Sequence, residues 1–571
     1  MDMSVTQINS ESSIPIEQHF RVSAGPGAGK THWLVNHIKG VLHQSERLSK
    51  TRKIVCITYT NVAVEIILER LGTATDRVEV STIHSFLYKH IIKPYVSFIA
   101  DEYKLDVQKI DGHDDIILSS YPFLQEWKNQ TGQKRIQDNS KIVKAIKDAR
   151  WKFDSSGKLI IKTDYPHKVD GYPIKNDSYL KYKEMSWEMG VLHHDDVLFF
   201  SYQLIMKFPF ILKVLRAKFP YFFIDEFQDT SPIQAKILSQ IGQEETIVGV
   251  IGDKAQSIYK FQGADPLQFS SFRLADVAEY QISENHRSTS KIIDFLNCIR
   301  SDIQQIKPEN IDEGDKPKII VGEIGKALRK VQELSKDEII CTLSRDNVTS
   351  NIMKREANAD FSNGSLLEDL YSIDSSSDRR KIIIACIKAT ELACQKRFKE
   401  AIKELTKVSP DNDEINRKKE ALRHINYLLG KYDDIQKMSL FDFHSFIKNN
   451  IRDSIANPSR GNIKPFYENH TYQQLAVCVK NSDDKSFNRT THKAKGDEFE
   501  IVLLVLRKSS DLSFLLNPDL EGNEEHRINY VAVSRAKRKL FISIPSLTDL
   551  SSPQKSKLFS LLDVIEISDE I

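Results

Sequence analysis

The sequence has few cysteines, no long apolar run and almost no net charge, and each absence excludes a class of protein. Its six cysteines form no CxxC pair, which indicates reduced thiols rather than a disulfide scaffold, a zinc site or an iron–sulfur site. No stretch approaches the roughly 18 apolar residues that a membrane helix needs. The first residues are polar and lack the apolar centre of a signal peptide. We therefore expect a cytoplasmic protein that does not contact a membrane.

The charge balance argues against a chain that is basic throughout. There are 81 Lys and Arg residues against 79 Asp and Glu residues, a net charge of +2, and 40% of the residues are hydrophobic. This composition is typical of a soluble globular protein, and the length of 571 residues allows several domains. Any surface for nucleic acid must then be a local groove rather than a basic domain.

Short apolar runs alternate with amphipathic segments in much of the chain. Residues 19–42 contain a short apolar run, a glycine-rich turn and an amphipathic segment, and residues 52–72 repeat the order. Two further apolar runs, 221–226 and 246–253, end in acidic residues. The pattern predicts an α/β fold with parallel sheets flanked by helices, and ligands at the carboxyl ends of the strands.

Two stretches interrupt this alternation, and we predict that both are largely helical insertions. Residues 96–190 are charged and aromatic, and residues 351–479 include the Ser/Asp-rich stretch "SIDSSSDRR", which we interpret as a linker. After the linker we expect a helix in which Cys394, Phe398, Ile402 and Leu405 share one face.

The stretch "AGPGAGKT" has the residues of a phosphate-binding loop. Its glycines allow backbone N–H groups to turn toward phosphate oxygens, Lys30 can reach the β- and γ-phosphates, and the Thr31 hydroxyl can bind Mg²⁺. The predicted nucleotide-binding residues here are Ala24, Gly25, Pro26, Gly27, Ala28, Gly29, Lys30 and Thr31. The expected cofactors are ATP and Mg²⁺.

The stretch "YFFIDEFQDTSP" places two carboxylates directly after an apolar run. A strand that reaches the surface and turns polar is the plain interpretation. Together with a phosphate-binding loop, however, the pair predicts a hydrolytic site in which Asp225 binds Mg²⁺ with Thr31. Glu226 is then the predicted general base for the attacking water.

Further blocks follow in a fixed order. They include "TYTNVAVEIILERL", "VSTIHSFLYKHI", "VIGDKAQSIYKFQGADP", "ISENHRST", "RTTHKAKGDEFEIVLL" and "EEHRINYVAVSRAKRKL". With the phosphate-binding loop and the acidic stretch, this order resembles the UvrD/Rep/PcrA-like helicases of superfamily 1, in which Ala24 also has its counterpart.

The resemblance implies two RecA-like motor domains, each carrying an accessory insertion. The first motor domain is expected at residues 1–95 and 191–285, and the second at residues 286–350 and 480–571. The insertions, residues 96–190 and 351–479, resemble domain 1B and a reduced domain 2B.

The resemblance also assigns roles in catalysis. Gln256 is expected to sense the γ-phosphate, while Arg287 and Arg535 resemble the arginine fingers that the second motor domain contributes. A guanidinium group in such a position neutralises charge on the transferring phosphoryl group.

Four further residues are expected around the base and ribose of the nucleotide. Glu498 resembles the ribose-contacting glutamate of the family, and Gly496 permits its close approach. His286 replaces the tyrosine that stacks on adenine. Gln7 is the candidate for the glutamine that reads adenine, in preference to Gln18.

The resemblance also implies a track for single-stranded DNA. Tyr59, Tyr259 and Phe261 lie in segments that match those in which the family stacks aromatic side chains on bases. Phe261 replaces a tryptophan, and His194 replaces the aromatic residue before the family's DD pair. The predicted DNA-contacting residues are Tyr59, Asn61, His84, His194, Tyr259, Phe261 and His492.

The resemblance implies an ATP-dependent DNA helicase or translocase that moves on single-stranded DNA with 3′→5′ polarity. The short second insertion resembles compact, GajB-like family members, which occur beside OLD-type (TOPRIM) nucleases in Gabija-type anti-phage modules. The expected partners are therefore DNA and such a nuclease. Two alternatives stay open: a general repair or replication-restart helicase, and a nucleotide- and DNA-sensing regulator that unwinds little.

Overall fold

The computed structural model divides the chain into two compact units. The P-loop unit comprises Met1–Lys316 and Ser513–Arg538, and the second unit comprises Pro317–Leu512 and Lys539–Ile571. Residues 286–316 and 513–538, which we expected in the second motor domain, thus cluster with the phosphate-binding loop. The structure describes residues 5–110, 121–336, 338–346, 349–350, 352–353, 366–374, 376–394, 397–411, 413–459, 463–481 and 487–567.

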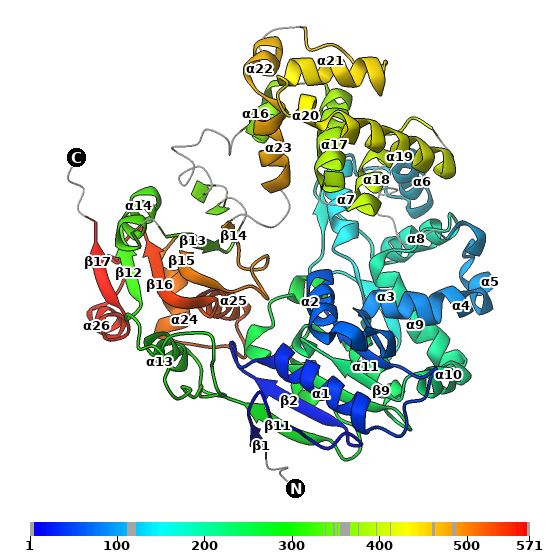
Figure 1. Cartoon of the computed structure of the whole chain (residues 1–571). Helices are drawn as coiled ribbons and strands as arrows, with labels where there is room; N and C mark the ends of the chain where they lie inside the picture. Colours follow the sequence, from blue (N-terminus) through cyan, green and yellow to red (C-terminus); the bar gives the residue numbers. More distant parts are fainter. Residues whose placement is uncertain are drawn as a thin grey trace. The chain divides into compact units, whose positions relative to one another are not determined.

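A seven-stranded sheet forms the centre of the P-loop unit, in the order β1-β11-β2-β10-β9-β3-β4, and every neighbouring pair is parallel (Figure 1). Its strands are β1 (Thr6–Ile8), β2 (Phe20–Ala24), β3 (Ile54–Thr58), β4 (Val78–Thr82), β9 (Tyr221–Ile224), β10 (Ile247–Gly252) and β11 (Ala278–Ile282). The helices of this unit outside the insertion are α1 (Lys30–Gln44), α2 (Asn61–Leu71), α3 (Ile83–Leu87), α9 (His194–Lys207), α10 (Phe210–Lys218), α11 (Pro232–Ile241), α12 (Leu267–Ser271), α13 (Ser290–Ile299), α24 (Ser513–Leu516) and α25 (Glu524–Val533). The predicted parallel α/β fold is confirmed.

The strand β9 shows why its sequence is apolar throughout. Tyr221 and Phe223 pack into the core on the α1 side of the sheet, while Phe222 and Ile224 pack into the core on the α9 and α11 side. All four side chains are buried, because alternate residues of a strand point to opposite faces and helices cover both. The strand therefore delivers Asp225 to the carboxyl edge of the sheet.

The first insertion combines helices with two antiparallel strand pairs. Its helices are α5 (Ala100–Tyr103), α6 (Tyr121–Thr131), α7 (Asn139–Lys147) and α8 (Asn176–Trp187), and the short helix α4 (Lys93–Tyr95) directly precedes it. Strand β5 (Arg150–Phe153) pairs with β6 (Leu159–Lys162), and β7 (Lys168–Val169) pairs with β8 (Tyr172–Pro173).

A buried carboxylate joins this insertion to α9. Asp196 accepts hydrogen bonds from the indole Nε1 of Trp151 at 2.9 Å and of Trp187 at 3.1 Å. It also lies 2.9 Å from the Lys183 ammonium, and both side chains are almost fully buried. Because a buried charge needs a partner, this contact ties α8 and β5 to α9.

A six-stranded sheet forms the centre of the second unit, in the order β14-β13-β15-β16-β12-β17. Its strands are β12 (Lys318–Val321), β13 (Ile340–Ser344), β14 (Asn488–Thr490), β15 (Phe499–Val505), β16 (Ala536–Ile544) and β17 (Asp563–Glu566), with helices α14 (Ile324–Leu334) and α26 (Ser552–Leu561). The second insertion has its own apolar core. Its helices are α16 (Leu366–Ile373), α17 (Ser377–Cys394), α18 (Phe398–Thr406), α19 (Glu414–Gly430), α20 (Tyr432–Ile435), α21 (Leu440–Asn450), α22 (Ile463–Asn469) and α23 (Tyr472–Asn481).

The single helix expected across residues 394–405 is wrong. Helix α17 ends at Cys394 and α18 begins at Phe398, since Arg397 has the non-helical backbone angles φ −86° and ψ 56°. Leu405 is buried, but Phe398 is 44% exposed. The four residues therefore do not share a buried face.

The Ser/Asp-rich stretch is not a linker either. Asp374 is fully buried and accepts a hydrogen bond from Arg379 Nε at 2.8 Å. The Tyr467 hydroxyl donates to the same carboxylate at 2.8 Å. A run of small polar residues thus carries a buried ion pair that connects α16, α17 and α22.

No single helix among the residues described is long and apolar enough to cross a membrane. The pair α9 and α10 reaches the required length and composition only when taken together, and it is bent by 106°.

Gly249 in β10 is predicted to tolerate no side chain. A Cβ atom there would lie 2.0 Å from Phe20 Cζ, whereas a Cβ atom at Gly40 in α1 would have no neighbour within 4 Å. We expect Gly249→Ala to lower the free energy of unfolding by about 1–3 kcal/mol. Gly40→Ala should raise it by up to about 1 kcal/mol, because alanine favours a helix interior. Chemical denaturation measures both, and equal stability of the two variants would contradict the packing argument.

Candidate active site and adjoining cavity

The phosphate-binding loop connects the end of β2 to the start of α1, and its backbone requires glycine. Gly27 and Gly29 have φ angles of 73° and 76°, in the left-handed region that favours glycine. A Cβ atom at Gly27 would also lie 2.2 Å from Asn285 Oδ1. The loop is therefore shaped by both its own dihedral angles and a close neighbour.

Lys30 places a partly buried positive charge at this loop. Its Nζ donates to the backbone oxygens of Ala24 and Gly25, both at 3.3 Å. Burial lowers the pKa of Lys30, while the carboxylates of Glu226, Asp253 and Asp225 act in the opposite direction. A partly buried ammonium at the N-terminus of a helix is suited to a multiply charged anion such as a nucleoside triphosphate.

Asp225 and Thr31 lie together at the carboxyl edge of the sheet. The Thr31 hydroxyl donates to Asp225 Oδ2 at 3.4 Å, and the backbone N–H of Glu226 donates to Asp225 Oδ1 at 2.9 Å. Burial and the neighbouring Glu226 carboxylate raise the pKa of Asp225 to about 7. A carboxylate and a hydroxyl oxygen are ligands that suit Mg²⁺, and a bound cation would offset the repulsion between the two acids. The residues present therefore fit the predicted metal.

Glu226 has an unusual backbone conformation for a residue that is not glycine. Its φ angle is 55°, and such conformations are found at functional sites, where the surrounding structure compensates for their cost. The Gln228 side-chain amide donates to the Glu226 carboxylate, and its Oε1 accepts from the backbone N–H of Asp253 at 2.9 Å. Gln228 thus connects the predicted base to the loop after β10.

Gln256 and the two predicted arginine fingers lie in the P-loop unit. Arg535 Nη2 donates to Gln256 Oε1 at 2.9 Å. Arg287 Nη1 donates to the backbone oxygen of Ser534 at 3.1 Å. The backbone N–H of His286 donates to the Gly27 oxygen at 3.0 Å, so the segment that carries Arg287 is attached to the phosphate-binding loop.

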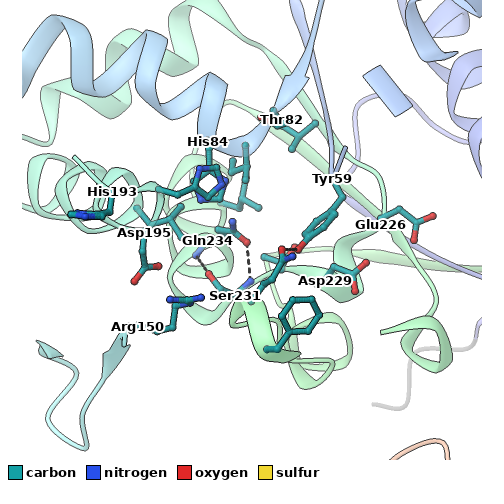
Figure 2. A pocket seen from close by; sticks show the side chains of 18 of the residues that line it. Tyr59, Thr82, His84, Arg150, His193, Asp195, Glu226, Asp229, Ser231 and Gln234 are labelled. Carbon is teal, nitrogen blue, oxygen red and sulfur yellow. Dashed lines mark hydrogen bonds between the residues drawn. The ribbon is translucent and has the colours of Figure 1, made fainter. Parts of the chain in front are cut away.

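A cavity of about 570 Å³ adjoins the acidic pair in the same unit (Figure 2). Tyr59, His84, His194 and Phe261 line it together with Glu226. The rings of His84 and His194 are stacked with their centroids 3.5 Å apart. The structure therefore brings four of the predicted DNA-contacting residues to one cavity.

Tyr259 joins this group by stacking. Its ring lies 4.6 Å from the ring of Tyr59, with an angle of 17° between the planes. Tyr259 also packs against Ile528 and Val531 of α25, four residues or more before Arg535. Tyr59 and Tyr259 thus share one small apolar cluster with α25, and Arg535 Nε donates to the backbone oxygen of Val531 in that cluster at 3.1 Å.

Comparison with known proteins gives two family matches along the chain. The UvrD/REP helicase N-terminal domain matches residues 5–275, and the UvrD-like helicase C-terminal domain matches residues 367–546. The chain belongs to the UvrD-like helicase family.

Individual members of the family are similar to this chain at modest identity. Gabija protein GajB of Bacillus cereus is 28% identical over 350 residues, which cover 53% of this chain and 50% of GajB. ATP-dependent DNA helicase PcrA of Bacillus subtilis is 27% identical over 305 residues, 51% of this chain and 39% of PcrA. A probable DNA helicase II homolog of Mycoplasma genitalium is 24% identical over 621 residues, 96% of this chain and 86% of that protein. The chain thus spans half or less of GajB and PcrA.

Three other predicted positions belong to the second unit. His492, Gly496 and Glu498 belong to the second unit, in the segment between β14 and β15. Gly496 has a φ angle of 94°, which explains a glycine there.

Three further residues predicted near the base or the DNA lie in the P-loop unit. Gln7 lies in the edge strand β1 and accepts a hydrogen bond from the Ser283 hydroxyl at 3.1 Å. The imidazole of His286 lies 3.3 Å from the Glu284 carboxylate. Asn61 is the first residue of α2.

Sequence reasoning missed several residues that support the site. Asn285 Nδ2 donates to Gln305 Oε1 at 2.9 Å, and Gln305 Nε2 donates to the Pro26 oxygen at 3.3 Å. Asn285 stands inside the block "ISENHRST" and could have been found there, whereas Gln305 lies outside every block. Arg150, from the first insertion, lines the cavity and carried no sequence signal.

Proposed function

We propose that this protein is an ATP-dependent DNA helicase or translocase that moves along single-stranded DNA with 3′→5′ polarity. The observation that supports it best is the grouping of Lys30, Asp225, Glu226, Gln256 and Arg535 in one compact unit. These are the groups that phosphoryl transfer to water requires.

In this proposal each side chain has a separate task. Lys30 and the loop amides bind the phosphates, and Thr31 with Asp225 holds Mg²⁺. Bound Mg²⁺ supplies positive charge to the phosphate oxygens. Glu226 accepts the proton of the attacking water. Arg287 and Arg535 neutralise charge on the transferring group, with Gln256 beside Arg535.

The cavity and the tyrosine stack support a DNA track next to this centre. Bases have apolar faces that stack on aromatic rings without regard to sequence, and Tyr59, His84, His194 and Phe261 offer such rings. Arg150 adds a cation that suits the phosphate backbone. His492 is proposed to extend the track in the second unit, and Gly496 and Glu498 to contact the ribose.

We also propose that the protein acts in anti-phage defence with an OLD/TOPRIM nuclease. The support is the similarity to Gabija protein GajB. The similarity to PcrA supports a second candidate, a general repair or restart helicase.

The motor proposal predicts that Lys30→Ala abolishes DNA-stimulated ATP hydrolysis, because the phosphates lose the cation that binds them. Phosphate release with and without single-stranded DNA measures this, and Lys39→Ala in the same helix should keep the activity. Full DNA-stimulated hydrolysis by Lys30→Ala would contradict the proposal.

ATP-dependent unwinding of a forked duplex and displacement of streptavidin from DNA separate a helicase from a translocase. If the wild type shows neither and nucleotide still changes a partner's activity, the protein is a sensor.

Phe261 provides a test of the DNA track, since it is 58% exposed and its replacement should not disturb the core. Phe261→Ala should weaken binding of single-stranded DNA by about 1–3 kcal/mol. Phe261→Trp, which restores the family's residue, should bind at least as tightly as the wild type. Fluorescence anisotropy at one fixed salt concentration measures both, and unchanged affinity in Phe261→Ala would remove Phe261 from the track.

The defence proposal predicts that a nuclease elutes with the protein when it is purified from its native cell. Co-elution should persist in Lys30→Ala, because binding of a partner does not require hydrolysis. Rescue of a DNA-repair defect by the wild type, without a co-eluting nuclease, would favour the repair helicase instead.

A further inference from the structure

Arg300 is a deeply buried arginine that none of the family blocks includes. It is the residue directly after α13, where its backbone N–H donates to the Leu296 oxygen at 3.2 Å. Its side chain is 1% exposed. A buried guanidinium carries a large desolvation cost, so its partners show what it holds in place.

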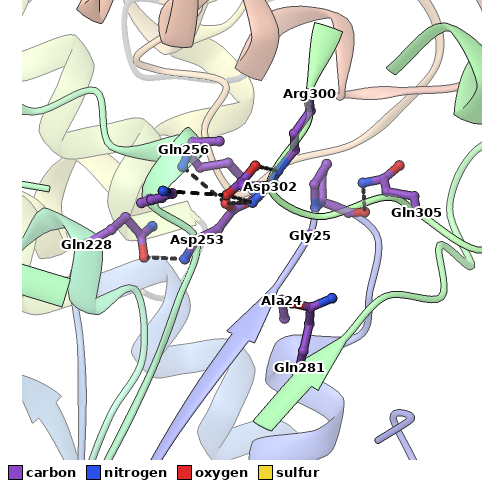
Figure 3. Close-up of polar contacts among 12 residues, drawn as sticks. Ala24, Gly25, Gln228, Asp253, Gln256, Gln281, Arg300, Asp302 and Gln305 are labelled. Atoms are coloured by element: carbon purple, nitrogen blue, oxygen red, sulfur yellow. Dashed lines mark hydrogen bonds and ion pairs between the residues drawn. The ribbon is translucent and has the colours of Figure 1, made fainter. Parts of the chain in front are cut away.

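One partner of Arg300 is the Asp253 carboxylate (Figure 3). Nη1 lies 2.8 Å from Oδ2 and Nη2 lies 2.7 Å from Oδ1, so the contact is bidentate. On its other edge, Arg300 Nε donates to Asp302 Oδ1 at 2.7 Å. Bidentate pairing fixes the plane of a carboxylate as well as its position.

Asp253 in turn orients Gln256. Gln256 Nε2 donates to Asp253 Oδ2 at 2.6 Å, and Gln256 Oε1 accepts from Arg535 at 2.9 Å. A carboxylate only accepts hydrogen bonds and a guanidinium only donates them, so these two neighbours allow one orientation of the amide. The orientation of Gln256 toward the arginine finger therefore depends on Asp253.

The same aspartate also reaches the predicted base through its backbone. Its N–H donates to Gln228 Oε1, and Gln228 donates to Glu226. A Cβ atom at Gly252 would lie 2.5 Å from Gln228 Oε1, so the chain approaches closely at this point. Two connections thus leave Asp253, one toward Glu226 and one toward Arg535.

The ionisation of Asp253 agrees with this arrangement. Burial raises its pKa, but the charges of Arg300 and Lys30 and the hydrogen bonds from Arg300 and Gln256 outweigh burial and hold the pKa below its usual value. The carboxylate is therefore charged and able to accept from Gln256.

We propose that Arg300 is a positioning residue for ATP hydrolysis. It fixes the Asp253 carboxylate, and Asp253 in turn orients Gln256 toward Arg535 and Gln228 toward Glu226. Arg300 itself touches neither phosphate nor water in this scheme. The inference rests on the proposed hydrolysis at this site and adds to it a residue outside the family blocks.

The test compares Arg300→Gln and Arg300→Lys with a matched control. Arg216 is also a buried arginine of the P-loop unit, bound to the backbone oxygens of Ile241 and Gln240. Arg216→Gln should lower the melting temperature without changing kcat. Arg300→Gln should lower kcat by about 10–100-fold, as removal of a residue that orients a site usually does, with KM for ATP close to the wild-type value. Arg300→Lys keeps the charge but not the bidentate contact, so its kcat should lie between those of Arg300→Gln and the wild type.

A double-mutant cycle separates positioning from a general loss of structure. If Arg300 acts in part through Gln256, Arg300→Gln should reduce kcat much less in a Gln256→Ala background than in the wild type. Wild-type kcat in folded Arg300→Gln, or additive effects in the cycle, would overturn the inference. If Arg300→Gln does not fold, wild-type kcat in Arg300→Lys would overturn it. A wild-type protein without DNA-stimulated ATPase activity would instead reject the proposed function.

Discussion

The partly buried ammonium of Lys30 is the charge around which the rest of the candidate site is arranged. Three carboxylates, Asp225, Glu226 and Asp253, act on it electrostatically. They come from the ends of two adjacent strands, β9 and β10, which pair in parallel beside β2. Because parallel strands end at the same edge of a sheet, side chains far apart in the sequence meet opposite the phosphate-binding loop.

Backbone geometry limits the site as strongly as charge does. Gly27 approaches Asn285 too closely for a side chain, and Glu226 has a left-handed conformation. Neither feature favours folding by itself. In the proposed mechanism the two residues flank the phosphate and the attacking water, and backbone strain is often found at functional sites.

Short, contiguous patterns allowed much of the molecule to be predicted. The strand, loop and helix around residues 20–44 follow from the local conformational preferences of their residues. The apolar run of β9 follows from its burial by helices on both faces of the sheet. Asp225, Thr31 and Gln256 were found for the same reason, since each stands in a dense block. The helix predicted across residues 394–405 was wrong because it depended on a long and weak apolar spacing. Helical spacing continued from Cys394 to Leu405, but the helix ends between them at a residue with non-helical angles.

The sequence by itself determined the family and the parallel α/β fold, and it indicated the residues proposed to bind phosphate and Mg²⁺, because these patterns depend on neighbours within a few positions. Only the tertiary structure decided which distant side chains support them. Arg300 is 47 positions from Asp253 along the chain and Gln305 is 279 positions from Pro26. Ion pairs and hydrogen bonds over such separations leave no periodicity, since they depend on how α13 and the loop after it pack against the sheet. The stretch "SIDSSSDRR" shows the same limit, because a polar run looks like a linker until Asp374 meets Arg379 and Tyr467 in a buried core.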